Sequence, residues 1–250
     1  LMIDWLLSIL ETPKSLAGPF ERLPPSAAPY TVAASAEIVR PGEKAPGLYL
    51  LQSGVAGRSI RQPDGRRQIT ALLFPGDCFG ARSCLDQPFD HFIESLTALR
   101  AIHVPRGVLN ELMIESPRAT HALWQRMLRS DEIAREWLVN VGSRPAPERT
   151  AHLFCEIFVR LRAQGCTVDN SCVLPLTQCD LGDVLALTPV HVNRTLRVLR
   201  EDGLAVLQRG LLRIPNLERL QEFAGFSADY LAHSRQGPRP RTQVALAGVA

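Results

Sequence analysis

Four polar side chains between residues 189 and 200 have the chemistry needed to read DNA. His191, Asn193, Arg194 and Arg197 can hydrogen-bond to base edges or phosphates. At helical spacing they share one face, and the apolar residues between them fall on the opposite face. A short helix whose exposed face carries Arg, Asn and His, braced by another helix, suits the major groove. The stretch therefore predicts a recognition helix.

A bracing helix is indicated just before it. Thr177 is a good N-cap, and Asp180, three residues on, completes a capping box. Thr188 caps the second helix, and Pro189 takes its first position, where a missing N–H costs nothing. Gly182 has no side chain, so the second helix can cross closely there. The pattern predicts a helix-turn-helix; an ordinary helical hairpin with a solvated basic face is the alternative.

A hairpin after the second helix indicates a wing. Residues 204–214 read as two short strands that turn at Arg209-Gly210. Arg209 at the tip is then placed for phosphate contacts. Together these elements predict a winged helix-turn-helix. We expect its DNA-binding residues to be Thr177, Gln178, Thr188, Val190, His191, Asn193, Arg194, Arg197 and Arg209.

Charge distribution agrees with a specific DNA-binding protein. The 250 residues carry a net charge of only +3, yet five arginines lie between Pro189 and Ile214. No apolar run approaches the length of a membrane span. The apolar segment 1–10 contains Asp4 and lacks a basic start, which favours an amphipathic helix over a signal peptide. We expect a cytoplasmic protein with no membrane partner, whose cysteines are reduced thiols.

The N-terminal half reads as short strands between glycine turns. Asp64-Gly65 marks a tight hairpin between strands 55–61 and 67–73, and 93–104 reads as a final strand. Strands at this spacing predict a jelly roll.

A long amphipathic helix follows at 118–141. An apolar stripe on a helix normally packs against a core. Here one side of the stripe must pack against the roll, and the other side still needs a partner that covers it. A parallel dimer coiled coil satisfies both. The expected seam comprises Leu123, Met127, Ala134, Trp137 and Val141, with Trp124, Leu128 and Leu138 beside it.

Several segments of the chain resemble the CRP/FNR superfamily of bacterial transcription regulators. Segments 41–43, 48–54, 64–66 and 75–80 resemble its sensor β-roll, and 144–154 with the helix-turn-helix and wing resemble its DNA-binding domain. The resemblance covers about 35–226, in family order. It implies an α+β fold: a cyclic-nucleotide-binding-type β-roll, a long dimerisation helix and a C-terminal winged helix-turn-helix. It also implies a homodimer on palindromic double-stranded DNA, with RNA polymerase as a further partner.

We accordingly expect five regions. They are a helical lead-in (1–29), a β-roll sensor domain (30–117), a dimerisation helix (118–141), a winged helix-turn-helix domain (142–226) and a flexible tail (227–250).

The effector is not identified by the sequence. The family's cAMP binders place Glu directly after the Phe-Gly turn and an Arg-Ser or Arg-Thr pair soon after. Here Ala81 follows Phe79-Gly80, and Arg82-Ser83 comes too early. A buried phosphate would lack its arginine, so cAMP is not expected. The candidate effector pocket comprises Phe79, Gly80, Ala81, Arg82, Ser83 and Trp124.

Other cofactors receive little support. The family's oxygen sensors carry N-terminal cysteines for an iron–sulfur cluster, and here the first cysteine is Cys78, so that cluster is not expected. Haem stays open, since iron could be bound by His91, His103 or His121. Cys179 is a redox candidate, because a helix N-terminus favours the thiolate; an inert cysteine is the alternative.

No phosphate loop, nucleophile elbow or metal-ligand spacing appears in the sequence, so we expect neither an enzyme nor a metal site. We expect a transcription regulator controlled by an effector or redox signal at the roll. A redox or small-molecule sensor that acts through protein contacts is the alternative.

Overall fold

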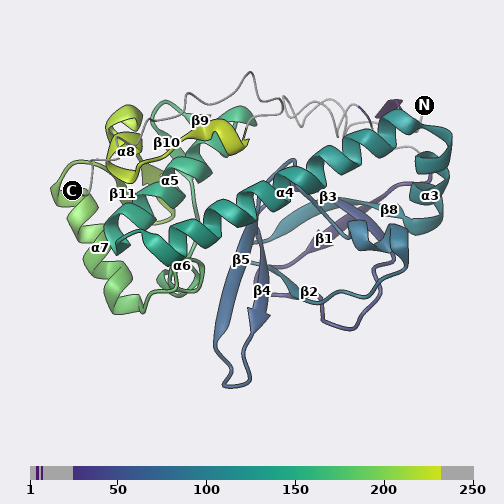
Figure 1. The fold of residues 1–250 in the computed structure, drawn as a ribbon, viewed down its shortest axis with the longest axis horizontal. Helices are drawn as coiled ribbons and strands as arrows, with labels where there is room; N and C mark the ends of the chain where they lie inside the picture. Colours follow the sequence, from purple (N-terminus) through teal and green to yellow (C-terminus); the bar gives the residue numbers. More distant parts are fainter. Residues whose placement is uncertain (1–3, 6, 8–24, 232–250) are drawn as a thin grey trace, which may run out of the picture.

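The computed structural model describes residues 4–5, 7 and 25–231. A β-rich domain and a mostly helical domain lie side by side, and one long helix, α4, runs from the first to the second (Figure 1). Most of the predicted lead-in 1–29 falls outside the described residues, and strand β1 begins at Ala28. None of the described helices has the length and apolarity to span a membrane.

The N-terminal domain is the expected β-roll. One sheet has the order β1-β8-β3-β6, and the other has the order β2-β7-β4-β5, with antiparallel pairing throughout. Buried side chains such as Leu51, Ile93 and Leu99 form its core. The strands are β1 (Ala28–Val32), β2 (Glu37–Val39), β3 (Gly47–Ser53), β4 (Ala56–Arg61), β5 (Arg67–Leu73), β6 (Cys78–Phe79), β7 (Phe92–Ser95) and β8 (Leu99–Pro105).

The hairpin at Asp64-Gly65 forms as predicted, with Gly65 at a φ of 84°. The single strand expected over 93–104 was wrong. It is two strands, because the chain crosses from one sheet to the other at 96–98. Thr97 fixes this crossing, since its hydroxyl accepts a hydrogen bond from the Val55 amide at 2.9 Å.

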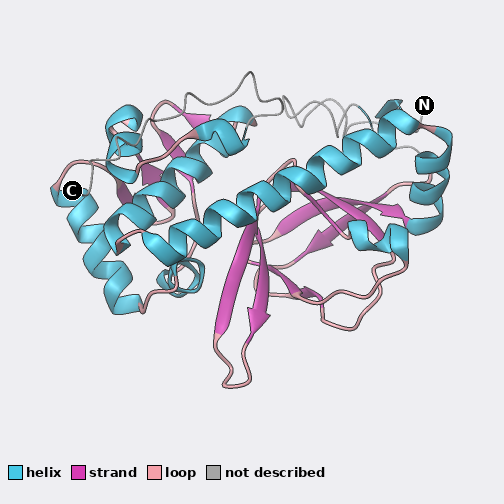
Figure 2. Cartoon of the chain, viewed as in Figure 1, coloured by secondary structure: helices cyan, strands magenta, loops and turns pink. Residues whose placement is uncertain are grey.

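Helix α4 (Pro117–Ser143) follows the one-turn helix η1 (Ala81–Leu85) and helix α3 (Arg106–Glu115). Ser116 caps it by accepting from the Ala119 amide at 3.2 Å. Figure 2 shows α4 crossing in front of the strands. Near its start Leu123 is buried in a cluster with side chains of β3, β8 and α3, and near its end Trp137 is buried in a cluster with side chains of α5. Both had been predicted for the dimer seam, so the seam needs correction at these positions.

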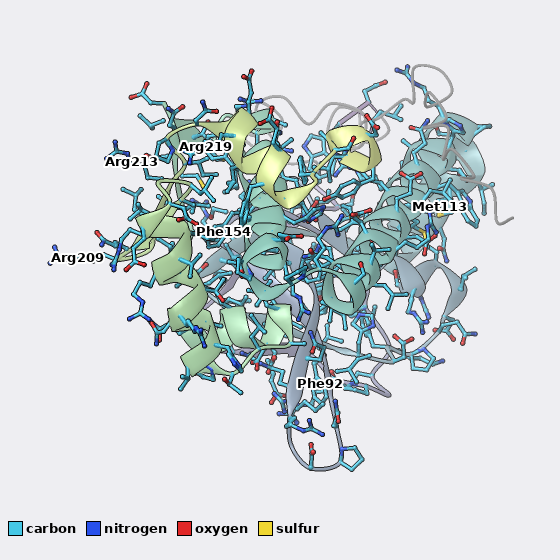
Figure 3. All side chains as sticks on the ribbon, turned by 60° about the vertical axis from the view of Figure 1, so that its left-hand side comes forward. Phe92, Met113, Phe154, Arg209, Arg213 and Arg219 are labelled. Carbon is cyan, nitrogen blue, oxygen red and sulfur yellow. The ribbon has the colours of Figure 1, made fainter. Side chains whose placement is uncertain are left out.

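The C-terminal domain surrounds helix α5, whose Phe154 and Ile157 are fully buried. Phe154 lies between the helices in Figure 3. A four-stranded sheet of order β11-β12-β10-β9 forms the wing side. The elements are α5 (Ala146–Ala163), β9 (Thr167–Val168), β10 (Ser171–Val173), α6 (Gln178–Leu185), α7 (Pro189–Glu201), β11 (Val206–Gln208), β12 (Leu211–Arg213) and α8 (Leu217–Ala224).

The predicted flexible tail begins too early. A further one-turn helix, η2 (Ala228–Leu231), packs on the domain, and Tyr230 and Leu231 are buried. The Tyr230 hydroxyl donates to Glu156 Oε2 at 2.9 Å, which anchors the segment. Residues 232–250 lie outside the described part of the chain.

Candidate nucleic-acid interface

Both helices of the predicted helix-turn-helix begin at the expected residues. Thr177 Oγ1 accepts from the Asp180 amide at 3.0 Å, and the Thr177 amide donates to Asp180 Oδ2 at 3.0 Å, which completes the capping box. Thr188 Oγ1 accepts from the His191 amide at 3.3 Å, and Pro189 is the first residue of α7. These caps fix where each helix starts.

The turn between α6 and α7 requires a glycine on α6. A Cβ on Gly182 would lie 2.6 Å from the Leu187 carbonyl oxygen and 3.9 Å from Val192 Cγ2. We predicted that Gly182 permits a close helix crossing. The tightest approach is instead to the backbone of the turn, so a larger residue there would push the turn away.

The exposed face of α7 carries the predicted polar residues. Val192 and Leu199 are buried against the domain, whereas His191, Asn193, Arg194 and Arg197 are exposed. Val190 is 77% exposed at the N-terminal end of this face. A groove between α7 and β11 is lined by Arg194, Arg197 and also Arg200. Arg200 was not among the predicted contacts, although it follows Arg197 by three residues on the same helix.

Gln178 and Asn193 hold each other across the two helices. Gln178 Nε2 donates to Asn193 Oδ1 at 2.7 Å, and Asn193 Nδ2 donates to Gln178 Oε1 at 2.7 Å. Each amide keeps one N–H and one lone pair for a further partner. Sequence reasoning selected both residues but could not find the contact, because nothing local couples positions fifteen apart. The pair fixes the orientation of two groups that can recognise adenine.

The wing turns as expected. Arg209 and Gly210 have φ values of 50° and 74°, the conformation of a tight hairpin turn. Figure 3 shows Arg209 extending from the tip, with Arg213 on the same side of the domain. Both are exposed.

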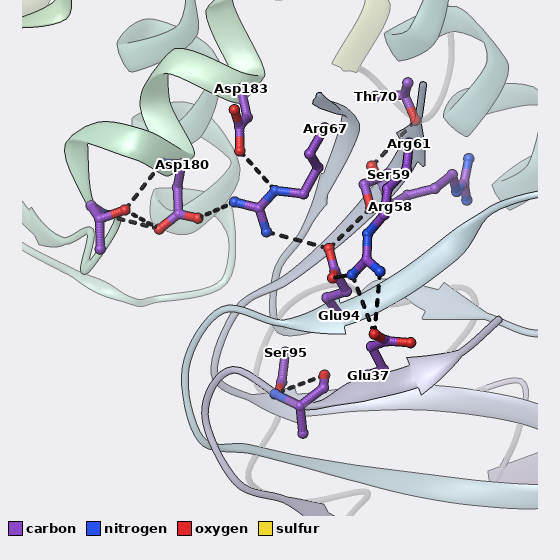
Figure 4. A network of polar contacts seen from close by, with 12 residues as sticks. Glu37, Arg58, Ser59, Arg61, Arg67, Thr70, Glu94, Ser95, Asp180 and Asp183 are labelled. Atoms are coloured by element: carbon purple, nitrogen blue, oxygen red, sulfur yellow. Dashed lines mark hydrogen bonds and ion pairs between the residues drawn. The ribbon is translucent and has the colours of Figure 1, made fainter. Parts of the chain in front are cut away.

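The β4–β5 hairpin docks on the first helix of the helix-turn-helix (Figure 4). Arg67 Nη2 lies 2.7 Å from Asp180 Oδ1, and Arg67 Nε lies 2.7 Å from Asp183 Oδ2. Next to it, Gln68 Nε2 donates to the Asp183 carbonyl oxygen at 2.6 Å. Burial alone would lower the pKa of Arg67, but the two aspartates outweigh it and raise that pKa. The sensor domain is thus tied by charge to the helix that braces α7.

We expect Arg67→Ala to loosen this contact. It leaves Asp180 and Asp183 without their cation, a loss of about 2 kcal/mol for partly buried, charged hydrogen bonds. Amide hydrogen exchange in peptides covering 178–185 should accelerate by about tenfold or more. Arg66→Ala is the matched control, because Arg66 is 73% exposed and its ion pair is with Asp64 in the hairpin turn. Equal exchange in the two variants would contradict a coupling role for Arg67.

The six residues predicted for the effector pocket range from buried to exposed. Phe79 and Ser83 are buried, and Trp124 is 56% exposed. Arg82 is held in its own loop, since Nη1 donates to the Pro88 carbonyl at 2.9 Å and Nη2 pairs with Asp90 at 3.0 Å. An arginine already paired with an acid is poorly placed to take a phosphate.

Calorimetric titration with cAMP at micromolar concentrations should therefore give no saturable heat. Ala81 offers no carboxylate for a ribose, and Asp90 neutralises Arg82. A submicromolar dissociation constant, about −8 kcal/mol or tighter, would show that the pocket binds a cyclic nucleotide by other residues.

The three candidate haem ligands lie in separate places: His91 just before β7, His103 on β8 and His121 on α4. His91 Nδ1 is 2.6 Å from Asp90 Oδ1, and the His103 ring lies 4.8 Å from the Tyr49 ring centroid on the roll. His121 is exposed on α4. Burial lowers the pKa of both His91 and His103. Among the described residues there is no cluster of three or more metal-ligating side chains.

All six cysteines are free thiols. Burial raises the pKa of Cys78, Cys84, Cys155, Cys166 and Cys172. Cys179 is exposed at the second position of α6, directly after Gln178.

Peroxide should weaken DNA binding through Cys179. A sulfinic acid there would bring negative charge next to Gln178, which lines the groove with Arg194 and Arg197, where a DNA phosphate is expected. Binding by the untreated protein and by Cys179→Ser should agree, whereas after peroxide only the wild type should bind more weakly, by about tenfold for one unfavourable charge. Equal peroxide sensitivity in Cys179→Ser would place the reactive thiol elsewhere.

An apolar surface remains uncovered on α4. Trp124, Leu128 and Leu138 are 56%, 58% and 75% exposed, and Met127 and Val139 are 42% and 50% exposed. Residues 124, 128, 131, 135 and 138 alternate steps of four and three, the spacing of a coiled-coil seam. Three of them are apolar, and Asp131 and Arg135 between them form an ion pair. Ala134 is exposed and Val141 is half-buried. Of the predicted seam, Met127 and Ala134 are thus exposed and only Leu123 and Trp137 are buried, while Trp124, Leu128 and Leu138 beside it add further exposed apolar surface.

Comparisons with known proteins agree with this architecture. Residues 30–116 match the family model of the cyclic nucleotide-binding domain, and 148–223 match that of the Crp-like helix-turn-helix domain. The chain is 30% identical to the nitrogen fixation regulation protein FixK of Azorhizobium caulinodans over 188 residues, 74% of this chain and 75% of that protein. It is 29% identical to the transcriptional activator FnrL of Cereibacter sphaeroides, over 77% of this chain and 78% of that protein. The structure of FixK2 from Bradyrhizobium japonicum superposes with a TM-score of 0.73 and 26% identity, covering 81% of this chain and 99% of that one.

Proposed function

This chain belongs to the CRP/FNR family of transcription regulators, and we propose that it binds a palindromic promoter site as a homodimer through α7 and the wing. The main observation that supports this proposal is the exposed face of α7. Arg194 and Arg197 project from a helix that α6 braces, with its apolar side chains buried behind. A helix presented in this way fits the major groove, and Arg209 at the wing tip can reach the phosphates.

Base reading falls mainly to Arg194. In the family pattern the recognition helix offers Glu, Ser and Arg to each half-site, with Arg meeting guanine. Arg194 stands at the Arg position, Asn193 at the Ser position and Val190 at the Glu position. Valine cannot accept a hydrogen bond from cytosine, but its methyl groups can contact thymine. The half-site of this protein therefore keeps the guanine that Arg194 reads. It differs from the half-site sequence of the family at the base pair that Glu would contact.

Two copies are needed to read a palindrome. The exposed seam of Trp124, Leu128 and Leu138 supplies an apolar surface that a second α4 would cover. Recognition helices must then stand about 34 Å apart to enter successive major grooves. A small rotation of the DNA-binding domain about α4 would change this distance and with it the affinity.

Regulation enters through the β-roll. The contact of Arg67 with Asp180 and Asp183 offers a route by which a change in the roll reaches the helix-turn-helix. The promoter-bound dimer acts on RNA polymerase. The protein works in the cytoplasm, where the promoter DNA and the polymerase are found.

Retention of DNA at physiological salt tests this function. Genomic fragments selected by the protein should be held at 0.15 M salt, whereas scrambled duplexes of equal length should be released, since nonspecific contacts are screened there. Equal release of both would contradict sequence-specific binding.

A further inference from the structure

Gln178 and Asn193 form a closed pair that occupies one edge of each amide. Gln178 Nε2 donates to Asn193 Oδ1, and Asn193 Nδ2 donates to Gln178 Oε1, both at 2.7 Å. Because both bonds join the same two amides, each amide uses a donor and an acceptor that lie side by side. That edge is the one with which a single Asn or Gln makes two hydrogen bonds to adenine. While the pair is intact, neither side chain can read adenine in this way by itself.

A different edge remains on each side of this pair, which we call the amide pair. On one side the second lone pair of Asn193 Oδ1 lies next to the second N–H of Gln178 Nε2. On the other side the second N–H of Asn193 Nδ2 lies next to the second lone pair of Gln178 Oε1. Each side therefore offers one acceptor and one donor on adjacent atoms, and each of these two groups comes from a different helix.

The amide pair is placed where DNA would meet the protein. Both side chains are exposed, and both line the groove along α7 that also contains Arg194 and Arg197. Gln178 is the first residue of α6, directly after the N-cap Thr177, so the capping box fixes its backbone. An isolated exposed amide side chain would lose conformational freedom when it binds. Here the two side chains already restrain each other, so less of that freedom remains to be lost.

Only adenine complements a donor and an acceptor that lie side by side. In the major groove adenine offers the N7 acceptor next to the N6 amino donor. Guanine offers two acceptors, so the acceptor of the amide pair would face the guanine O6 without a hydrogen between them. Thymine offers one acceptor and a methyl group, and cytosine offers one donor, so each leaves part of the amide pair unsatisfied. Polar groups left unpaired in an interface reduce affinity.

We propose that the amide pair reads one adenine in each half-site as a single unit. Asn193 directly precedes Arg194 in α7. Consecutive Cα atoms are about 3.8 Å apart, close to the rise of about 3.4 Å per base pair. The adenine therefore lies next to the guanine of Arg194. Gln178 becomes a specificity-determining residue, although it belongs to the bracing helix α6. This inference rests on the proposed function and adds a second base to the half-site.

Binding to DNA with single changed bases tests the amide pair. Selection from random-sequence DNA by the full-length protein first gives the half-site. Fluorescence anisotropy then compares duplexes that carry each of the four bases at the positions flanking the guanine. The wild type should prefer adenine at one of them by about tenfold, as for a good contact with two bonds. Replacing that adenine with 7-deazaadenine, which keeps the base pair and lacks only the N7 acceptor, should weaken binding about fivefold.

The variants Gln178→Ala and Asn193→Ala should each lose most of the preference for adenine. The double variant should lose no more than either single variant, because the two amides act together. All three should keep the guanine preference of Arg194, which shows that the helix-turn-helix is still folded. Gln87→Ala is the matched control, because Gln87 is an exposed glutamine on the roll and its loss should leave both preferences unchanged.

The contradicting outcomes point to different alternatives. An adenine preference that survives in Gln178→Ala would show that Asn193 reads the base without its partner. An even loss on all duplexes, with no effect of 7-deazaadenine, would show that the amide pair contacts a phosphate. Selection of an inverted repeat with the guanine but no adenine would overturn this inference and leave the proposed function intact. Selection of no repeat would contradict the proposed function and this inference together.

Discussion

Leu138→Asp should split the dimer. Leu138 is 75% exposed in the single chain and lies on the apolar seam of α4 with Trp124 and Leu128. In a coiled coil the substitution would bury a carboxylate on each helix without a partner, at a cost of about 3–5 kcal/mol. The dimer dissociation constant should rise about a hundredfold or more. Sedimentation velocity across a concentration series measures it directly, and binding to a palindromic duplex should fall with dimerisation.

Leu85→Asp is the matched control for this prediction. Leu85 is 73% exposed, nearly as much as Leu138, but lies on η1 of the roll rather than on α4. A general effect on solubility or folding would appear in both variants, whereas an effect on the dimer interface should appear only in Leu138→Asp. A Leu138→Asp protein that sediments as a dimer with wild-type affinity would place the interface on another surface.

Arg194→Ala should remove the preference for one base pair in each half-site. Arg194 is exposed on α7, where a guanidinium can donate two hydrogen bonds to guanine O6 and N7. Its loss should cost about 1–3 kcal/mol on the preferred site and little on a site mutated at that guanine. Fluorescence anisotropy with both duplexes, at fixed salt, gives the two free energies.

Arg209→Ala at the wing tip is the comparison for Arg194→Ala. A phosphate contact carries no sequence information, so this variant should weaken all duplexes alike. The slope of log affinity against log salt should decrease by about one. An even loss across sequences in Arg194→Ala would instead identify Arg194 as a phosphate contact.

Local signals explain why the DNA-binding half was predictable. The capping box of Thr177 and Asp180, Pro189 at the first helical position, and the turn at Arg209-Gly210 each depend on neighbours within a few residues. Such signals survive in the sequence because the backbone itself requires them. The N-terminal β-roll was predictable for a different reason: its turn segments resemble those of the family and occur in the same order.

Contacts between distant segments could not be predicted in the same way. Arg67 meets Asp183 across 116 residues, and no local pattern marks either residue as a partner. Periodicity showed that α4 is amphipathic but not which apolar residues face inward. Leu123 and Trp137 are buried because two different domains cover the two halves of one helix. Likewise Tyr230 is held in place because Glu156, on α5, accepts a hydrogen bond from its hydroxyl.

Selection from random-sequence DNA tests the central claim most directly. Duplexes enriched by the full-length protein at 0.15 M salt should contain an inverted repeat whose half-site centres lie about one helical turn, roughly 10 base pairs, apart. Each half-site should include a guanine whose enrichment disappears when Arg194→Ala is used for selection. Enrichment of no common word, or of a single unrepeated word with the same guanine preference in both proteins, would contradict a dimer that reads DNA through α7.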